Sequence, residues 1–368
     1  MNRIIDFLKK EIVLSVSFVL ALISMFFVPP SEKYFDYIDF RTLGLLFSLM
    51  TIMAGLNKMG IFRLLAKNLL NKAKTMRGVT LLLVLLCFFS SMLITNDVAL
   101  ITFVPFSVVL LKLANKQNRM IFVVTLETIA ANLGSMLTPI GNPQNLYLFS
   151  AYNMNISDFF YTIAPYAMLS LGLLVIFSLF SDKSELANLG DREEVIFDKG
   201  LLTMYAVLFA IALLSVFRVL NYIVLLAVVI VFVLIFDRKV LLKVDYSLLF
   251  TFVFLFIFIG NLGNIAQINS WLSEIVGGNE VVVGVLASQV FSNVPAAILL
   301  SGFTCNAAAL MIGVNIGGLG TLIASMASLI SFKFIQKESV SIAKYLGVFT
   351  LLNVVFLAAN LALWVVVK

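Results

Sequence analysis

The residues best suited to chemistry in this chain are short polar groups inside long apolar segments. The two clearest groups are Thr95-Asn96-Asp97 and Ser292-Asn293-Val294. Hydroxyl and amide groups at such positions can bind substrates and ions, and an intramembrane carboxyl group marks a functional site by default. We therefore predict substrate contacts from Thr95, Asn96, Ser292 and Asn293.

A second pair of polar groups follows the first pair in the same order along the chain. These groups are Asn132-Leu133-Gly134 through Thr138, and Asn315-Ile316-Gly317 through Thr321. The two Thr95 and Ser292 groups align at an offset of 197 residues, and the later groups align at an offset of 183. The repeated order predicts two related halves, each with one helical hairpin and one interrupted helix.

Each half therefore supplies a candidate ion site and candidate hydroxyl ligands. One predicted ion site consists of Asn96, Asn132 and Gly134, with Asp97 as a further ligand. The equivalent site consists of Asn293, Asn315 and Gly317. Thr138 and Thr321 are predicted to add hydroxyl groups for the substrate. The alternative is that these residues only join helices, as intramembrane Asn and Ser often do and as Gly313-x-x-x-Gly317 would in close helix packing.

Two carboxylates, Asp97 and Glu127, lie deep in apolar segments. A carboxylate at a helix centre costs about 2.5 to 3.5 kcal/mol on insertion scales, so both are candidates for proton coupling. Asp97 is also a candidate cation ligand. The structural alternatives are a carboxylate satisfied by neighbouring N–H groups for Asp97, and a position near the cytoplasmic helix end for Glu127.

The composition excludes a water-soluble enzyme. Of the 368 residues 62% are hydrophobic and 12% charged, whereas soluble domains have about 25% charged residues. The chain has no histidine, which excludes His-ligated metals and Ser-His-Asp triads. We expect no enzymatic activity, no cofactor, no metal beyond a possible Na⁺, and no nucleic-acid partner, because the basic residues cluster between apolar runs. Cys87 and Cys305 are expected to be buried thiols.

The apolar runs predict an all-α polytopic membrane protein. Its nine spanning segments are 12–28, 42–57, 120–150, 159–180, 200–217, 222–236, 246–263, 306–332 and 343–367. Runs 120–150 and 306–332 are interrupted. Two further pairs, 78–94 with 98–111 and 281–291 with 294–304, are predicted re-entrant hairpins. The arms of the second pair have 11 residues each and reach only about 16 Å, half of the hydrocarbon core. Basic residues flank the first pair on both sides, as expected if it enters and leaves through one face.

This topology predicts a first repeat over 1–180, a cytoplasmic linker over 181–199 and a second repeat over 200–368. The scaffold helices are 12–57 and 200–263, the cytoplasm-opening hairpin is 78–111, and the outward-opening hairpin is 281–304. The N-terminus is then inside and the C-terminus outside. Only four of the 25 basic residues fall outside, as the positive-inside rule requires: Lys33, Arg41, Arg218 and Lys368. Arg218 is interpreted as an interface anchor.

Helix breaks inside a membrane suit charged ligands. The N-terminus of each half-helix carries a partial positive charge of about +0.5 that attracts anions. The carbonyl end of the preceding half-helix, together with Asn side-chain oxygens, suits Na⁺. The sequence thus predicts both kinds of site at the centre of an inverted repeat.

Residues 40–335 resemble the ion transporter superfamily, which includes divalent-anion/sodium symporters, citrate transporters, arsenite permeases and a group of sodium/proton antiporters. Asn132-Leu-Gly-Ser-Met-Leu-Thr-Pro-Ile-Gly-Asn-Pro-Gln-Asn145 is similar to the family's interrupted-helix signature. Ser292-Asn293-Val294 resembles the Ser-Asn-Thr tip of dicarboxylate carriers, and Thr95-Asn96-Asp97 resembles the Asn-Asp tip of arsenite permeases. The third tip position departs from the dicarboxylate pattern in both halves.

The resemblance implies a homodimer in which a transport domain moves against a scaffold, an elevator mechanism. We expect a secondary transporter in the cytoplasmic membrane of a prokaryote that moves a small di- or tricarboxylate-like or inorganic anion, coupled to Na⁺ or H⁺. The alternative is arsenite or antimonite efflux, or Na⁺/H⁺ exchange, with Asp97 as the essential carboxylate. The sequence offers no nucleophile–base pair for an intramembrane enzyme and no loop large enough for a receptor domain.

Overall fold

The computed structural model describes residues 11–60, 75–184 and 198–367, which form helices and their connections. The first half contains α2 (Ile12–Phe27), α3 (Tyr34–Tyr37), α4 (Phe40–Lys58), α6 (Met76–Ile94), α7 (Asn96–Leu113), η1 (Gln117–Arg119), α8 (Met120–Ser135), α9 (Pro143–Ala151) and α10 (Ile156–Leu179). The second half contains α11 (Lys199–Val216), α12 (Tyr222–Phe236), η2 (Arg238–Lys243), α13 (Tyr246–Gly263), α14 (Ala266–Val276), α15 (Glu280–Phe291), α16 (Asn293–Ser301), α17 (Ala307–Ile316), η3 (Leu322–Ala324), α18 (Met326–Ile335) and α19 (Ile342–Val367).

Seven of the described helices are long and apolar enough to cross a membrane: α4, α6, α7, α10, α11, α13 and α19. The predicted all-helical membrane class is therefore confirmed. The predicted set of nine crossings differs from these seven. It left out both arms of the first hairpin, and it included the shorter α2 and α12 and the two interrupted runs, 120–150 and 306–332. The sequence also missed α14, which meets α15 at an angle of 110°.

The two helical hairpins differ in arm length. The first joins α6 and α7, with arms of 19 and 18 residues, and the second joins α15 and α16, with arms of 12 and 9 residues. At 1.5 Å per residue the first arms are about 27 Å or longer, whereas the second reach about 18 Å at most. The second pair is thus too short to span a hydrocarbon core of roughly 30 Å, whereas both arms of the first are candidate spans.

Both predicted helix interruptions are present. Residues 136–142 separate α8 from α9, and residues 317–325, which include η3, separate α17 from α18. The start of α9, the second segment of the first interrupted helix, is stabilised by residues next to it in the sequence. The side chain of Asn142 accepts a hydrogen bond from the backbone N–H of Asn145, and Pro143 occupies the first turn of α9, where no N–H is needed.

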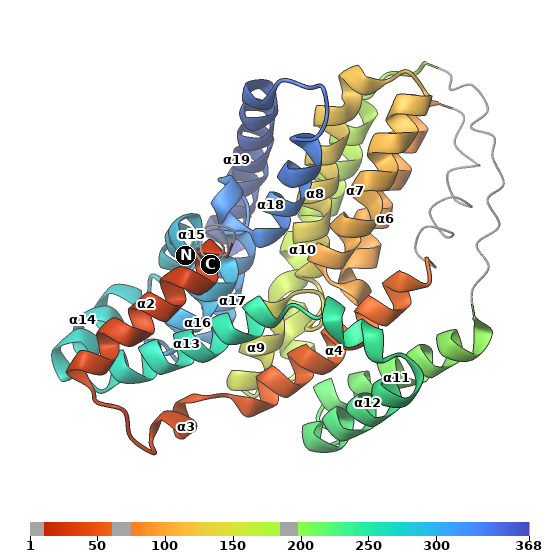
Figure 1. Cartoon of the computed structure of the whole chain (residues 1–368). Helices are drawn as coiled ribbons and strands as arrows, with labels where there is room; N and C mark the ends of the chain where they lie inside the picture. Colours follow the sequence, from red (N-terminus) through yellow and green to blue (C-terminus); the bar gives the residue numbers. More distant parts are fainter. Residues whose placement is uncertain (1–10, 61–74, 185–197, 368) are drawn as a thin grey trace, which may run out of the picture.

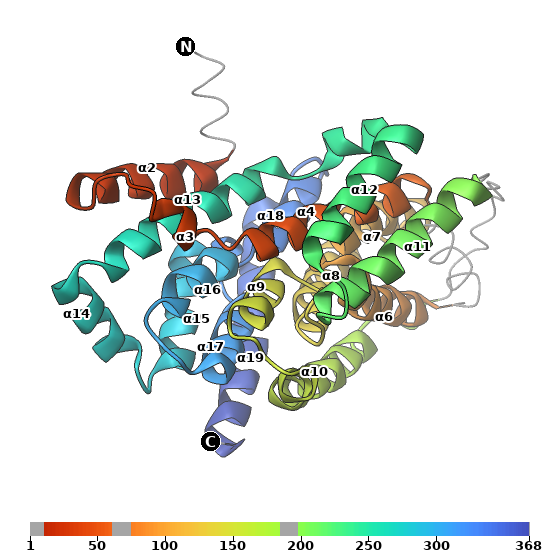
Figure 2. The ribbon, with the colours of Figure 1, turned by 90° about the horizontal axis from the view of Figure 1, so that it is seen from below.

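The helices form two groups. One is a row in which α2 packs on α13 and α4 packs on α11 and α12, and the other contains the hairpins and the interrupted helices (Figures 1 and 2). The row contains the helices that the sequence assigns to the scaffold. Most of the predicted linker, residues 185–197, lies outside the described residues.

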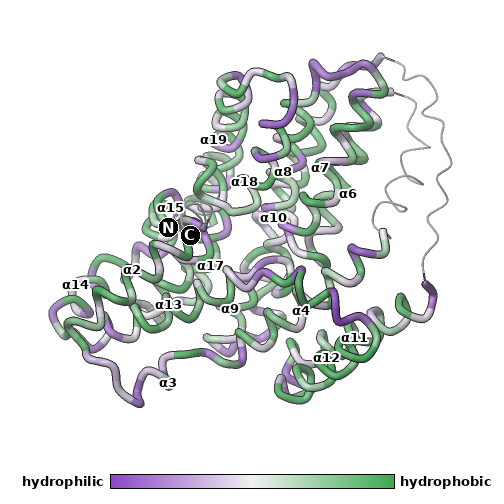
Figure 3. The backbone as a smooth tube through the Cα atoms, in the orientation of Figure 1, coloured by the Kyte–Doolittle hydropathy of each residue, from purple (hydrophilic) through white to green (hydrophobic). Residues whose placement is uncertain are grey.

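Hydrophobic residues occupy most of the length of the helices (Figure 3), and many large apolar side chains are exposed. Phe26, Leu242 and Val366 are each more than 80% exposed. Helices that are apolar on all sides are typical of segments surrounded by lipid. The two thiols are free, and Cys87 is buried, but Cys305 is exposed, which corrects the expectation that both are buried.

Candidate substrate and ion site between two helix tips

A single non-helical residue joins the arms of each hairpin. Thr95 has φ 71° and ψ 152°, and Ser292 has φ 72° and ψ 154°. This is a region that essentially only glycine occupies, and a residue held there costs of order 1–3 kcal/mol. Two strained, non-glycine residues with matching backbone angles are a signature of a constrained functional position rather than of ordinary turns.

The tip of the first hairpin is tied to the first helix interruption. The backbone N–H of Asn96 donates a hydrogen bond to the carbonyl oxygen of Gly141 (3.0 Å), and its side-chain amide donates to Oδ1 of Asn132 (3.2 Å). The backbone N–H of Asp97 donates to Oδ1 of Asn96 (3.0 Å). The structure therefore brings Asn96 and Asn132 into direct contact, as two members of one predicted ion site.

The buried side chain of Asn132 also reaches the interruption in the other half. Its Oδ1 atom accepts a hydrogen bond from the Ser325 hydroxyl (2.9 Å), and its Nδ2 atom donates to Oγ of Ser328 (3.5 Å). Ser325 precedes α18 and Ser328 lies in its first turn. Asn132 thus joins the first tip to the second interrupted helix.

Asn315 makes the corresponding contacts in the opposite direction. Its Oδ1 atom accepts from Nδ2 of Asn142 (3.3 Å), and its Nδ2 atom donates to Oδ1 of Asn145 (2.7 Å). Counting 183 residues on from Asn142 and Asn145 gives Ser325 and Ser328, the partners of the other asparagine. The offset found between the two asparagines therefore also relates their hydrogen-bond partners.

A small cavity lies where these elements meet. Its volume of about 10 Å³ is enough for roughly one water molecule. It is lined by Asn96, Asp97, Pro143, Gln144, Leu248, Asn293, Val294, Ser325, Met326 and Ala327. Both hairpin tips and the start of the second segment of both interrupted helices contribute to this lining, so the four predicted helix breaks converge. We refer to this space as the tip cavity.

Asp97 is the one ionisable side chain among the residues that line the tip cavity. Its Oδ1 atom is buried and has no hydrogen-bond partner in the described part of the chain. A buried acceptor without a partner is costly, and a proton or a cation would satisfy it. The side chain is therefore placed to take part in proton or cation binding.

Nine of the twelve predicted site residues do not line the tip cavity: Thr95, Glu127, Asn132, Gly134, Thr138, Ser292, Asn315, Gly317 and Thr321. The hydroxyl of Thr138 donates to the carbonyl oxygen of Met92, and Thr321 is exposed. A Cβ atom on Gly134 would lie 2.1 Å from the carbonyl oxygen of Phe88, and one on Gly317 would lie 2.8 Å from the Ser288 hydroxyl. Both glycines permit close helix packing, which was the structural alternative for Gly317.

Glu127 is fully buried but does not line the tip cavity. Its Oε1 atom accepts a hydrogen bond from the Ser107 hydroxyl, and its Oε2 atom has no partner among the described residues. The Cys87 thiol lies 3.9 Å from Oε1. Glu127 is therefore embedded between α6, α7 and α8 rather than beside the tips.

The sequence reasoning missed several residues of this site. Asn142, Asn145, Ser325 and Ser328 make the crossed hydrogen bonds, and Gln289 donates from its side chain to the carbonyl oxygens of Gly317 and Leu319. The offset of 183 residues contained the signal for the first four. This offset pairs Asn142 with Ser325 and Asn145 with Ser328, so each pair consists of two polar residues. The pairs were missed because they follow the run of matching residues and their members differ in residue type.

Comparison with known proteins identifies the family. Residues 4–311 match the family described as "Citrate transporter". The chain belongs to this family. It is 32% identical over 350 residues to the uncharacterized transporter MJ0456 of Methanocaldococcus jannaschii, covering 94% of this chain and 95% of the relative. The inner membrane protein YbiR of Escherichia coli is 32% identical over 326 residues, covering 84% of this chain and 83% of YbiR.

A third relative matches part of this chain. The silicon efflux transporter LSI3 of Oryza sativa is 33% identical over 162 residues, covering 43% of this chain and 32% of LSI3. The family match and the first two relatives confirm the resemblance to the ion transporter superfamily. The protein is a membrane transporter of the citrate transporter and arsenite permease type.

Proposed function

We propose that the protein is a secondary transporter that binds a small anion between the two hairpin tips and carries it across the cytoplasmic membrane of a prokaryotic cell. The tip cavity must widen beyond the volume of one water molecule to admit the anion. The observation that carries this proposal is the convergence of both hairpin tips and both helix interruptions on one space beside Asp97. Breaks in membrane helices leave backbone groups free to bind ligands. The ligand is a small carboxylate or an inorganic oxyanion.

The proposal includes an inverted repeat with hairpins that enter from opposite faces. The matching angles at Thr95 and Ser292 and the hydrogen bonds that cross at one sequence offset support it. The open end of the first hairpin lies near the start of α8. The open end of the second lies near the end of α9, where the Tyr152 hydroxyl donates to the carbonyl oxygen of Thr304. The hairpins thus open at opposite ends of the first interrupted helix.

Coupling to Na⁺ or H⁺ is assigned to the first tip. An ionised Asp97 would repel an anion in the same space, so anion binding requires that this carboxylate be protonated or paired with a cation. The amide oxygen of Asn96 accepts from the backbone N–H of Asp97, and that of Asn132 accepts from the Asn96 amide, so the first tip holds oxygens of the kind that a Na⁺ site uses. Glu127 is the second candidate for proton coupling, at a position removed from the substrate.

The mechanism that fits this arrangement is movement of the hairpins and interrupted helices against the row of α2, α4, α11, α12 and α13. The row and the moving group meet along α13, because Leu248 lines the tip cavity. An elevator movement of this kind in a homodimer would expose the tip cavity alternately to either side. In this proposal the N-terminus lies inside and the C-terminus outside.

The test is uptake into proteoliposomes that contain the purified protein. Labelled citrate, succinate, phosphate and sulfate are offered separately, each with an inward Na⁺ gradient, an inward H⁺ gradient or no gradient. We expect saturable uptake of at least one anion that rises with one of the two gradients. Absence of uptake of every anion under every gradient would contradict the proposal.

A second candidate cargo is a neutral hydroxylated species such as arsenite or antimonite, and a related alternative is Na⁺/H⁺ exchange. The observation that favours it is that the tip cavity lining includes Asp97 but no Lys or Arg. The relative named as a silicon efflux transporter is consistent with such cargo. Everted vesicles with Asp97→Asn separate the two: Na⁺/H⁺ exchange should be lost, whereas anion transport should survive without its dependence on the coupling ion.

A further inference from the structure

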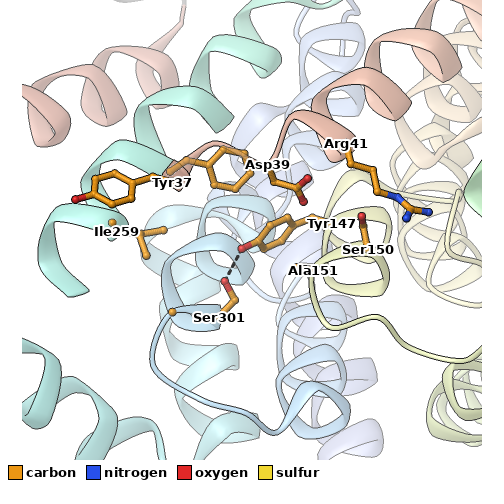
Figure 4. A pocket seen from close by; sticks show the side chains of 11 residues that line it. Tyr37, Asp39, Arg41, Tyr147, Ser150, Ala151, Ile259 and Ser301 are labelled. Atoms are coloured by element: carbon orange, nitrogen blue, oxygen red, sulfur yellow. Dashed lines mark hydrogen bonds between the residues drawn. The ribbon is translucent and has the colours of Figure 1, made fainter. Parts of the chain in front are cut away.

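A larger cavity lies at the other end of the helices that line the tip cavity. Its volume is about 450 Å³, within the range of pockets that bind small organic molecules. Its lining residues are Tyr37, Asp39, Arg41, Tyr147, Ser150, Ala151, Phe256, Ile259, Gly260, Ser301 and Gly302 (Figure 4). We call this space the vestibule. The orientation proposed above places it on the outer side of the membrane.

The vestibule and the tip cavity share the same three helices, α9, α13 and α16. On α13, Leu248 lines the tip cavity and Phe256 lines the vestibule. They are two helical turns apart on one face, a rise of about 12 Å. Phe252 lies midway between them on that face. The two cavities therefore lie at different heights along the same three helices.

Aromatic rings separate the two spaces. The ring centroid of Tyr147 lies 6.2 Å from that of Phe252 and 5.6 Å from that of Phe256, and all three side chains are buried. The Tyr147 hydroxyl is 2.7 Å from the Ser301 hydroxyl, which fixes this ring between α9 and α16 (Figure 4). A ligand in the vestibule would thus be held next to, but outside, the tip cavity.

Arg41 gives the vestibule a free cationic donor. Its Nη2 atom donates a long hydrogen bond to the carbonyl oxygen of Ser215 (3.4 Å), and its Nε atom is buried without a partner among the described residues. The nearby carboxylate of Asp39 is already engaged, because it accepts from the backbone N–H and the hydroxyl of Thr42. In Figure 4, Arg41 lies on the same side of the cavity as Ser150.

A second arginine adds positive charge at this end. Partial burial and the nearby charge of Arg41 lower the pKa of Arg218 below its usual value. Arg218 donates to the carbonyl oxygen of Phe149 (2.9 Å), next to Ser150 of the vestibule lining. Neither arginine has a carboxylate within ion-pair distance in the described ranges. Two guanidinium groups held near each other without such a partner form a site for an anion.

We propose that the vestibule is a second binding site, in which Arg41 holds a small carboxylate or inorganic oxyanion before it passes the Tyr147 ring into the tip cavity. The place of this site on a transport route rests on the proposed function, but binding in the vestibule does not require transport. Arg41 and Ser150 would contact the ligand directly. Arg218 would act through its charge.

Protection of an introduced thiol measures binding at this site without transport. Ala151 is exposed and lines the vestibule, so Ala151→Cys in a Cys305→Ser background provides a reporter, while the native Cys87 is buried. The purified protein is labelled with a maleimide in the presence of citrate or phosphate, with chloride at equal ionic strength. We expect citrate or phosphate, but not chloride, to slow labelling of the Ala151→Cys reporter in a saturable way.

Variants separate this site from the tip cavity. Arg41→Gln should remove the protection and Arg41→Lys should retain part of it, while Asn293→Ala at the tip should leave it intact. In uptake assays Arg41→Gln should raise KM by about tenfold, the value of one charged hydrogen bond, with kcat nearly unchanged. If Arg41→Gln does not fold, Ser150→Leu should reduce protection by filling the cavity.

The outcomes distinguish this proposal from the proposed function. Protection that is absent with wild-type Arg41, or that persists in both Arg41→Gln and Ser150→Leu, overturns the vestibule site. Protection by anions in a protein that transports no anion supports the site and contradicts the proposed function. Anion transport with no protection of the introduced thiol supports the proposed function and contradicts the vestibule site.

Discussion

Asn132 and Asn315 make equivalent hydrogen bonds in opposite directions across the molecule. Asn132 of α8 contacts Ser325 and Ser328 at the start of α18, and Asn315 of α17 contacts Asn142 and Asn145 at the start of α9. Each interrupted helix is therefore held by the interruption of the other. Such an exchange fixes the spacing between the two breaks, which determines the shape of the tip cavity.

The strained tip residues give a prediction in which stability and activity change in opposite directions. Thr95→Gly relieves a φ of 71° and should stabilise the purified protein by about 1 kcal/mol relative to Thr95→Ala, which keeps the strain. Transport by Thr95→Gly should nevertheless fall below that of the wild-type protein, because the hydroxyl and the fixed tip geometry are lost. Thermal unfolding in detergent measures the first effect, and a lower melting temperature for Gly than for Ala would contradict it.

The two buried carboxylates should respond differently to neutral substitution. Asp97→Asn should remove the dependence of uptake on the coupling ion, because Asp97 lines the tip cavity and lacks a partner for Oδ1 among the described residues. Glu127→Gln should keep that dependence, since Glu127 lies among α6, α7 and α8. Uptake by the Asp97→Asn and Glu127→Gln variants, measured with and without each ion gradient, shows which carboxylate couples transport to the ion. Loss of coupling in Glu127→Gln alone would assign the coupling role to Glu127 instead.

Gly134 should be required for folding rather than for ion binding. A methyl group added there would lie 2.1 Å from the carbonyl oxygen of Phe88, on the rigid backbone of α6. Gly134→Ala should therefore destabilise the protein by about 2 kcal/mol or more. Gly172→Ala is the matched control, because nothing lies within 4 Å of its added methyl group. Equal melting temperatures for the two variants would contradict the close packing of α6 and α8.

The native cysteines test the proposed orientation without any substitution. Cys305 is exposed after α16, at the open end of the second hairpin, and Cys87 is buried. A membrane-impermeant maleimide should label Cys305 in intact cells or right-side-out vesicles and should leave Cys87 unlabelled. Labelling of Cys305 only in everted vesicles would place the open end of this hairpin, and the vestibule beside it, on the cytoplasmic side.

The sequence predicted the positions of the helices well, because hydropathy follows burial in lipid directly. The run predicted over 246–263 has the same bounds as α13, and the breaks in 120–150 and 306–332 are present. Arm lengths of the first hairpin were harder to predict. Arg77 and Lys112 suggested insertion from one side, but charges near helix ends do not determine how far a helix extends into the membrane.

The candidate site was predicted in part. The tip residues were found because Asn96 and Asn293 interrupt apolar runs, and such residues need a polar partner. The roles of Thr138 and Gly134 depend on which main-chain atoms face them, Met92 and Phe88, and these contacts join helices distant in sequence. The vestibule was not predicted, because its polar residues come from separate helix ends and no local spacing connects them.

The central claim is that the space between the two hairpin tips binds the transported substrate, and paired tip substitutions test it most directly. Asn96→Ala and Asn293→Ala each remove one tip amide, whereas Asn353→Ala removes a buried amide on α19 that does not line the tip cavity. Initial uptake rates of the transported substrate are measured for each variant at equal amounts of folded protein. We predict loss of at least about tenfold in kcat/KM for both tip variants and near wild-type uptake for Asn353→Ala. Wild-type uptake by both tip variants would contradict the claim.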